Sequence, residues 1–84
     1  MVVEHLEDTI EMMCSPEYKE RFRAEYYQLS IRFVKLQIMV DRWDKGELDF
    51  TPTCPREMYD DQLDAMWNYL RVLEERATIE GVEL

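Results

Sequence analysis

The side chains that most often carry enzyme chemistry are scarce in this sequence and form no known catalytic pattern. His5 is the one histidine, and Cys14 and Cys54 each lie within two residues of a proline, so both cysteines are predicted in loops. A nucleophile needs a neighbouring base, and zinc sites need Cys or His at short fixed spacings, which these three residues lack. The sequence also has no glycine-rich phosphate loop and no Glu-x-x-His pair of the di-iron type. We therefore predict a non-enzymatic protein with no catalytic residues, no metal and no cofactor.

Carboxylates are plentiful, and three of them, Asp60, Asp61 and Asp64, are close together in the sequence. They fall in the first turns of a predicted helix, where acids complement the positive end of the helix dipole. A Mg²⁺ site built from these carboxylates is the alternative interpretation.

The basic residues in the middle of the chain show a more informative pattern. On a helical projection at about 100° per residue, four side chains share one flank of a predicted helix: Arg21, Gln28, Arg32 and Lys35. We call these four residues the basic flank; Glu25 only borders it. Such a flank suits a ligand with phosphates and flat rings, on which Tyr18, Tyr26 or Tyr27 would stack. Alternatively, the long side chains lie at the rim of an oligomer interface and pair with acids of the next helix.

The elements that must position these residues are helices. Ser15-Pro16 predicts a helix start with Ser15 as N-cap, and no helix breaker follows before Gly46. Gly81 predicts the end of a further helix, and the loop residues Leu48 and Phe50 are expected to pack against the helices. The predicted class is all-α: a short N-terminal helix plus a long antiparallel helical hairpin, in one domain spanning 1–84. Its parts are the short helix and loop 1–15, the long helix 16–45, the loop 46–55, the helix 56–78 and the tail 79–84.

The long helix carries two apolar stripes. The first stripe alternates spacings of four and three: Phe22, Tyr26, Leu29, Phe33, Leu36, Val40 and Trp43. The helix 56–78 has a matching stripe: Leu63, Met66, Leu70, Leu73 and Ala77. The second stripe of the long helix lies nearly opposite the first: Tyr27, Ile31, Val34 and Ile38. We expect a second chain to cover it in a homo-oligomer; the alternative is a monomeric three-helix bundle in which the N-terminal helix folds back.

The charge of the chain is unevenly distributed. The net charge is −9, from 19 acidic and 10 basic residues. Residues 1–16 carry four acids and no Lys or Arg (−4), residues 17–45 carry seven basic and five acidic groups (+2), and residues 46–84 carry three basic and ten acidic groups (−7). An acidic surface repels DNA and anionic membranes, and no apolar run is long enough to span a bilayer. We therefore expect a cytosolic protein that binds neither DNA nor membrane.

Two runs of the sequence resemble a known family. Residues 18–36 fit the pattern Y-x-x-R-Φ-x-x-E-Y-x-x-L-x-x-R-Φ-x-K-L, in which Φ is apolar. Residues 62–76 fit its partner helix, Q-L-x-x-M-x-x-Y-L-x-x-L-x-x-R. Both patterns are similar to those of small bacteriophage proteins that include the anti-CBASS sponges, and together the runs cover about residues 18–78.

The resemblance implies a function in immune evasion. In CBASS defence, an infected bacterium makes cyclic oligonucleotides that trigger a lethal effector, and the sponges sequester these signals without cleaving them. The family implies helical homohexamers in the host cytoplasm, with cyclic dinucleotides bound between subunits and cyclic trinucleotides bound in separate pockets. By motif position, Tyr18 would stack on a base and Lys35, with Arg32 as a competitor, would bind phosphate. Arg76 and Thr78 would serve the trinucleotide pocket.

Two other functions remain open at the level of sequence. The acids of the helix 56–78 and of the tail are also consistent with a protein-interaction module, or a nucleic-acid mimic, that inhibits a basic host protein. A nucleotide-cleaving protein is the third hypothesis, which the missing metal ligands and base disfavour. The ligand-binding residues predicted for the sponge are Tyr18, Arg21, Tyr26, Arg32, Lys35, Arg76 and Thr78.

Overall fold

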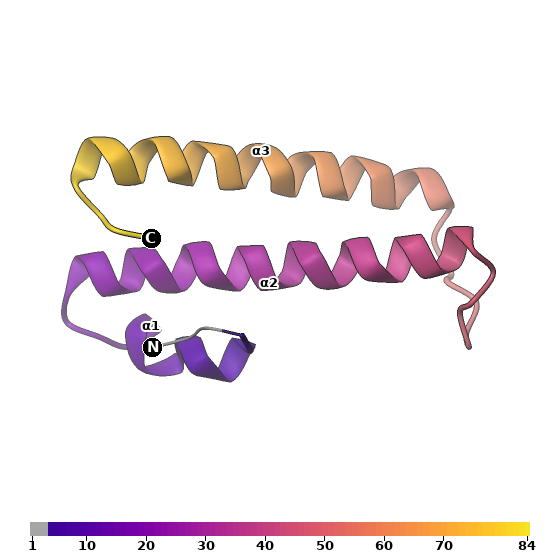
Figure 1. The fold of residues 1–84 in the computed structure, drawn as a ribbon, viewed down its shortest axis with the longest axis horizontal. Coiled ribbons are helices and arrows are strands. Elements are labelled where there is room, and N and C mark those ends of the chain that lie inside the picture. The colour runs from indigo at the N-terminus through magenta and orange to yellow at the C-terminus, as the bar shows by residue number, and fades with distance from the viewer. Residues whose placement is uncertain (1–3) are drawn as a thin grey trace.

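The computed structural model describes residues 4–84, which form helices and contain no strand. Two long helices, α2 (Tyr18–Asp44) and α3 (Arg56–Glu80), run antiparallel and side by side (Figure 1). A short segment precedes them, made of the 3₁₀ helix η1 (Leu6–Thr9) and the single-turn helix α1 (Ile10–Met13). The all-α class and the packing of the two long helices are thus confirmed. The predicted short N-terminal helix begins at Leu6 among the described residues, and residues 1–3 lie outside them.

The start of α2 differs from the prediction. The helix begins at Tyr18 with Glu17 at the N-cap position, so Pro16 lies outside it. The Ser15 hydroxyl accepts the backbone N–H of Glu17 at 3.0 Å. This bond closes a turn two residues long, of the kind that Ser makes before helices, rather than capping a helical N–H. The prediction of Ser15 as the N-cap is therefore wrong.

Both long helices end at a glycine in the left-handed conformation, as the sequence predicts. Gly46 has φ 70° and Gly81 has φ 71°. After α2, the N–H of Gly46 donates to the Trp43 carbonyl and that of Glu47 to the Arg42 carbonyl, both at 2.9 Å. This is the Schellman pattern, which satisfies carbonyls that the helix end leaves open. α3 runs to Glu80, two residues beyond the predicted end.

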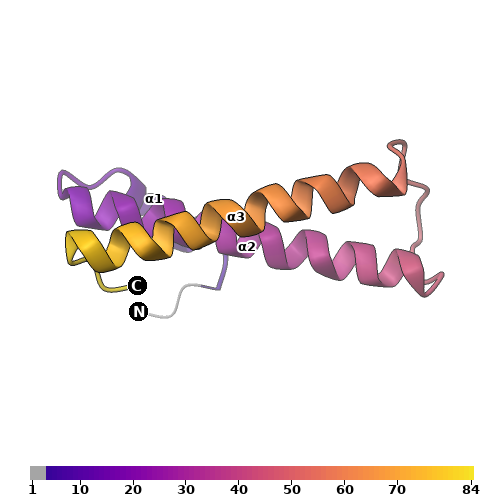
Figure 2. The same cartoon turned by 90° about the horizontal axis from the view of Figure 1, so that it is seen from above.

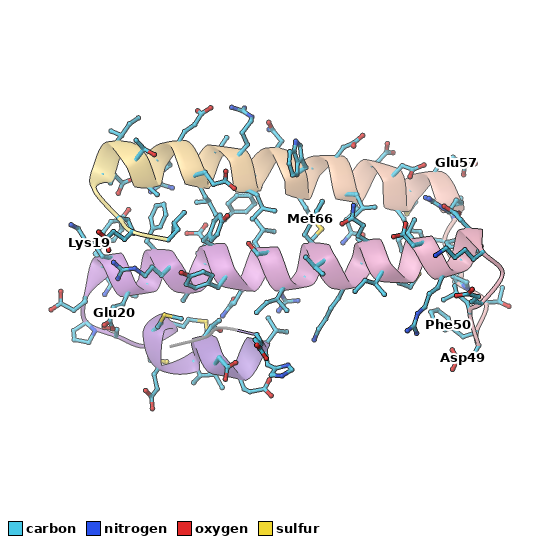
Figure 3. All side chains as sticks on the ribbon, viewed as in Figure 1. Lys19, Glu20, Asp49, Phe50, Glu57 and Met66 are labelled. Atoms are coloured by element: carbon cyan, nitrogen blue, oxygen red, sulfur yellow. The ribbon has the colours of Figure 1, made fainter. Side chains whose placement is uncertain are left out.

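The first apolar stripe of α2 and the matching stripe of α3 face each other, as predicted. Phe22, Leu73 and Ala77 form the buried core with Val82, which follows α3 and is 7% exposed. Toward the loop the packing is thinner, with Met66 half-buried and pointing from α3 toward α2 (Figure 3). Figure 2 shows the reason: the two helices cross at an angle, and their axes separate toward the loop.

Aromatic rings and one ion-pair cluster hold the loop end. The Trp43 and Tyr59 rings meet edge to face with centroids 5.6 Å apart. The guanidinium of Arg56 pairs with Asp44 at 3.0 Å and with Asp60 at 2.7 Å. In the loop itself Leu48 is half-buried, whereas Phe50 is 55% exposed. Phe50 nevertheless borders a hollow together with residues of α2, so it lies beside that helix without being buried against it.

Residues 4–14, which we call the N-terminal segment, fold back along the first half of α2 (Figure 1). Thr9 is completely buried there, and Ala24 of α2 is 1% exposed. In the second apolar stripe, Tyr27 and Ile31 are half-buried, whereas Val34 and Ile38 are 49% and 48% exposed. The fold-back that the bundle alternative requires is therefore present along the first half of the stripe. Only the second half is left for another chain. No helix of the described residues has the length and apolar content to cross a membrane.

Candidate ligand-binding groove on helix α2

Three of the four side chains of the basic flank come together in one groove. Arg21, Gln28 and Arg32 lie on a floor formed by α2. Met13 of α1 lines one side of the groove and Tyr69 of α3 lines another, and the volume is about 260 Å³. We call this the central groove. The helical spacing of the flank accounts for the floor, whereas the walls come from the two elements that pack against α2.

The cations of the flank are not neutralised within the chain by acids of α3. Arg21 donates through Nη1 to the backbone carbonyl of Ser15 at 2.8 Å. Across residues 4–84, the side chains of Arg32 and Lys35 make neither a hydrogen bond nor an ion pair. The cations that form ion pairs there are Arg56, Arg71 and Arg76. The alternative interpretation, in which these side chains lie at the rim of an oligomer interface, included pairing with acids of α3. Within one chain, the described residues show no such pairing. These cations remain available to an anion.

Lys35 lies beyond the central groove and borders two other hollows. One has a volume of about 440 Å³ and is also lined by Val34 and His5. The other has a volume of about 310 Å³ and is also lined by Arg42 and Phe50. Arg42 lies seven residues after Lys35, hence on the same side of the helix, and extends the cationic surface toward the loop. Sequence reasoning missed Arg42, although this spacing indicated it.

The central groove also contains a carboxylate that sequence reasoning placed at its border. Glu25 lies on the groove floor with the arginines. Its Oε2 accepts a hydrogen bond from the Tyr69 hydroxyl, which raises the pKa of Tyr69. Met13 and Tyr69 were missed as lining residues because their positions depend on contacts distant in sequence. The groove therefore combines two guanidinium groups, one carboxylate and an aromatic wall.

Tyr18 and Arg76 lie together, but away from the central groove. The Tyr18 hydroxyl donates to Glu80 Oε1 at 2.6 Å, and Arg76 donates through Nη2 to that hydroxyl at 3.0 Å. Arg76 also pairs with Glu80 Oε2 at 3.0 Å, and its guanidinium lies 5.1 Å from the centroid of the Phe22 ring. Hydrogen bonds lower the pKa of Glu80 and raise the pKa of Tyr18. The Tyr18 side chain nevertheless remains 48% exposed.

The other two predicted site residues belong mainly to the hairpin. Tyr26 is half-buried against the core, and its hydroxyl donates to Glu74 Oε1 at 2.9 Å. Burial, followed by the bond to Glu74, raises the pKa of Tyr26. The Thr78 hydroxyl is exposed and donates to the Glu74 carbonyl of its own helix at 3.2 Å. The predicted residues are thus spread over the groove, the Lys35 hollows and the Tyr18–Arg76 cluster.

Together, these features define a small helical protein with a cation-lined groove on α2. Among residues 4–84, no three His, Cys, Asp or Glu side chains are grouped so that they could hold a metal ion. The sequence model of the Sequestin family matches residues 16–79, so the chain belongs to the Sequestin family. The family name indicates a sequestering protein, in agreement with the resemblance to anti-CBASS sponges. No curated protein and no solved structure matches the chain.

Proposed function

We propose that this protein is a phage-encoded sponge. It binds cyclic oligonucleotide immune signals in the host cytoplasm, holds them without cleaving them, and so blocks CBASS-type defence. The ligands are cyclic dinucleotides, with cyclic trinucleotides in a second set of pockets. Membership of the Sequestin family supports the sequestering role. The nature of the ligand rests on the chemistry of α2 and on the resemblance of residues 18–36 and 62–76.

One observation carries the proposal: the unpaired cations of α2. The chain has 19 acidic residues against 10 basic ones, so acids for pairing are abundant. Yet Arg32, Lys35 and Arg42 make no ion pair across residues 4–84. Cations kept unpaired beside apolar and aromatic side chains suit a ligand that brings both phosphates and bases. Charge-assisted hydrogen bonds to phosphate are stronger than neutral ones, and they gain further when water is excluded.

A second copy of the chain would complete the pockets. The central groove, about 260 Å³, is smaller than the roughly 300–1,000 Å³ typical of ligand sites.

Exposed apolar residues are available for self-association. Val34 and Ile38 lie on α2. An outer stripe of α3, at spacings of seven, four, three and seven, consists of Met58, Ala65, Tyr69, Val72 and Ile79. All of these residues are exposed, and Tyr69 also lines the groove, so a chain packed on this stripe would lie next to the ligand. We propose the hexamer that the resemblance implies.

The proposed roles follow the positions of the residues. Arg21, Arg32 and Lys35 bind phosphates, and Tyr18, the most exposed of the three candidate stacking residues, stacks on a base. Tyr26 holds the hairpin beside the site through Glu74. Arg76 and Thr78 would serve the trinucleotide pocket, for which Arg76 must exchange its bond with Glu80 for one with phosphate.

Isothermal titration calorimetry with cyclic dinucleotides tests the proposal. We expect micromolar or tighter binding, and at least tenfold weaker binding for Lys35→Ala and Tyr18→Ala, because each removes a ligand contact. Lys45→Ala is the matched control, since Lys45 is exposed at the end of α2 outside the groove and the two Lys35 hollows. Chromatography after incubation should return the ligand intact.

Failure would take a distinct form for each alternative. If no cyclic dinucleotide or trinucleotide binds, the sponge is excluded and the acidic interaction module becomes the better hypothesis. If the ligand is recovered cleaved, the protein is an enzyme. If sedimentation at high protein concentration shows a single copy with and without ligand, the shared pocket is excluded.

A further inference from the structure

The polar side chains of the central groove follow a fixed order along α2. Arg21 lies at one end and Arg32 at the other, separated by roughly 16 Å at 1.5 Å per residue. Glu25 and Gln28 lie between them. The groove therefore offers positive charge at its two ends, and a carboxylate (Glu25) and an uncharged amide (Gln28) in its middle. A ligand that fits must present negative charge at the ends and a different chemistry between.

The N-terminal segment determines what Gln28 can offer. Its amide nitrogen Nε2 donates to Thr9 Oγ1 at 2.9 Å and to Met13 Sδ at 3.0 Å. Thr9 is completely buried and its hydroxyl donates to the Leu6 carbonyl at 2.6 Å, so this anchor is fixed. Both amide hydrogens of Gln28 are engaged by this segment, which leaves the carbonyl oxygen Oε1. Gln28 is therefore an acceptor toward the groove.

Glu25 is an acceptor as well, and Tyr69 orients it. Oε2 of Glu25 takes the hydrogen bond of the Tyr69 hydroxyl. Across residues 4–84 no group donates to Oε1 of Glu25, and a carboxylate has lone pairs for several donors. The middle of the groove thus presents two adjacent acceptors, because its donors among the described residues, the Gln28 amide and the Tyr69 hydroxyl, are already engaged. A base bound there must offer hydrogen-bond donors.

We propose that Glu25 is the residue that selects the base of the ligand, and that it selects guanine. The Watson–Crick edge of guanine carries two adjacent donors, N1–H and the N2 amino group, which a carboxylate can accept together. Adenine offers one donor, its N6 amino group, beside the acceptor N1, whose lone pair would face the carboxylate. With its volume of about 260 Å³, the groove has room for one base and its phosphate rather than a whole cyclic dinucleotide. The inference rests on the proposed function and names its preferred ligand.

The selection depends on a part of the chain outside the family match. The Sequestin match begins at residue 16, whereas Thr9 and Met13 lie before it. Without these two acceptors, the Gln28 amide would be free to turn a donor toward the groove. The N-terminal segment thereby converts a general cationic flank into one with a defined pattern of acceptors.

Calorimetry of the full-length protein with cyclic diguanylate and cyclic diadenylate tests the inference. We expect cyclic diguanylate to bind about tenfold tighter or more, because a bidentate side-chain contact to a base typically discriminates by that much. Glu25→Gln should reduce this preference to below threefold, since an amide can pair with the donor and acceptor of adenine. Glu20→Gln is the matched control: it removes the same charge near the start of α2, outside the groove (Figure 3), and should leave the preference unchanged.

The outcomes separate this inference from the function on which it rests. If cyclic diadenylate binds as tightly as cyclic diguanylate, the proposal that Glu25 selects guanine is wrong, although the sponge function stands. The same holds if Glu20→Gln changes the preference as much as Glu25→Gln does, because the effect would then be one of net charge. If neither nucleotide binds the wild-type protein, both the inference and the function fail. Tyr69→Phe, which leaves Glu25 in place without its orienting hydroxyl, should retain the preference for guanine but weaken it.

Discussion

At the end of the hairpin where α2 begins and α3 finishes, the N-terminal segment and the C-terminal tail both pack onto the helices. We call this the closed end. Arg23 donates to the carbonyl of Glu83 at 2.6 Å, and Lys19 (Figure 3) donates to that of Gly81 at 3.1 Å. The opposite end, which we call the open end, consists of residues 33–44, the loop and residues 56–67. Among the described residues, Val40 is the only buried side chain there.

The difference shows how stability and binding are divided in this fold. The closed end has the core, which a chain of 84 residues can form only once because small domains bury little surface. The open end retains the exposed Val34, Ile38 and Phe50 beside Lys35 and Arg42. The central groove begins in the closed end and leads toward these residues. We therefore expect mutations to lower stability at the closed end and to affect assembly and binding at the open end.

The largest effect expected is that of Leu73→Ala at the closed end. Leu73 is 1% exposed and packs with Phe22, so its truncation leaves a cavity and should lower the free energy of unfolding by about 2–5 kcal/mol. Leu63→Ala is the same change at the half-buried open end, and its cost should be less than half as large. Urea denaturation at a fixed protein concentration measures both. Equal losses would show that the two ends are equally well packed.

A second comparison uses the glycines that end the two helices. Gly46 and Gly81 have nearly the same φ, 70° and 71°, so alanine suffers the same left-handed strain at each, roughly 1–2 kcal/mol. At the open end the chain can relieve this strain by loosening an exposed turn. At the closed end, loosening would expose Val82, whose N–H donates to the Ala77 carbonyl at 2.8 Å. Gly81→Ala should therefore lower the midpoint of thermal unfolding more than Gly46→Ala does, as measured by circular dichroism. The reverse order would contradict the view that the tail stabilises the closed end.

The same division explains what could be predicted from the sequence. The helices and their facing stripes were predictable because periodicity and glycines are local signals. The floor of the groove was predictable because Arg21, Gln28 and Arg32 share one helix. The walls were not, because Met13 and Tyr69 reach the groove only through packing between distant segments. Ser15 was misassigned because a serine before a proline can cap either a turn or a helix.

The smallest effect expected concerns one carboxylate at each end. Hydrogen bonds from Tyr18 and Arg76 lower the pKa of Glu80 at the closed end, and hydrogen bonds from Arg56 lower the pKa of Asp44 at the open end. A carboxyl group with a lowered pKa in the folded state stabilises the protein above its unfolded pKa, and this contribution is lost as the pH falls through the folded pKa. Stability should thus decline on acidification below the ordinary values, 4.5 for Glu80 and 3.8 for Asp44. Glu80→Gln and Asp44→Asn should each reduce this decline slightly in thermal melts between neutral pH and pH 3, because both pairs are exposed and screened by water. Since Glu80 also holds Arg76 over Phe22, its substitution should have the larger effect. A larger effect of Asp44→Asn would show that the Asp44–Arg56 pair contributes more to stability than the bonds of Glu80 do.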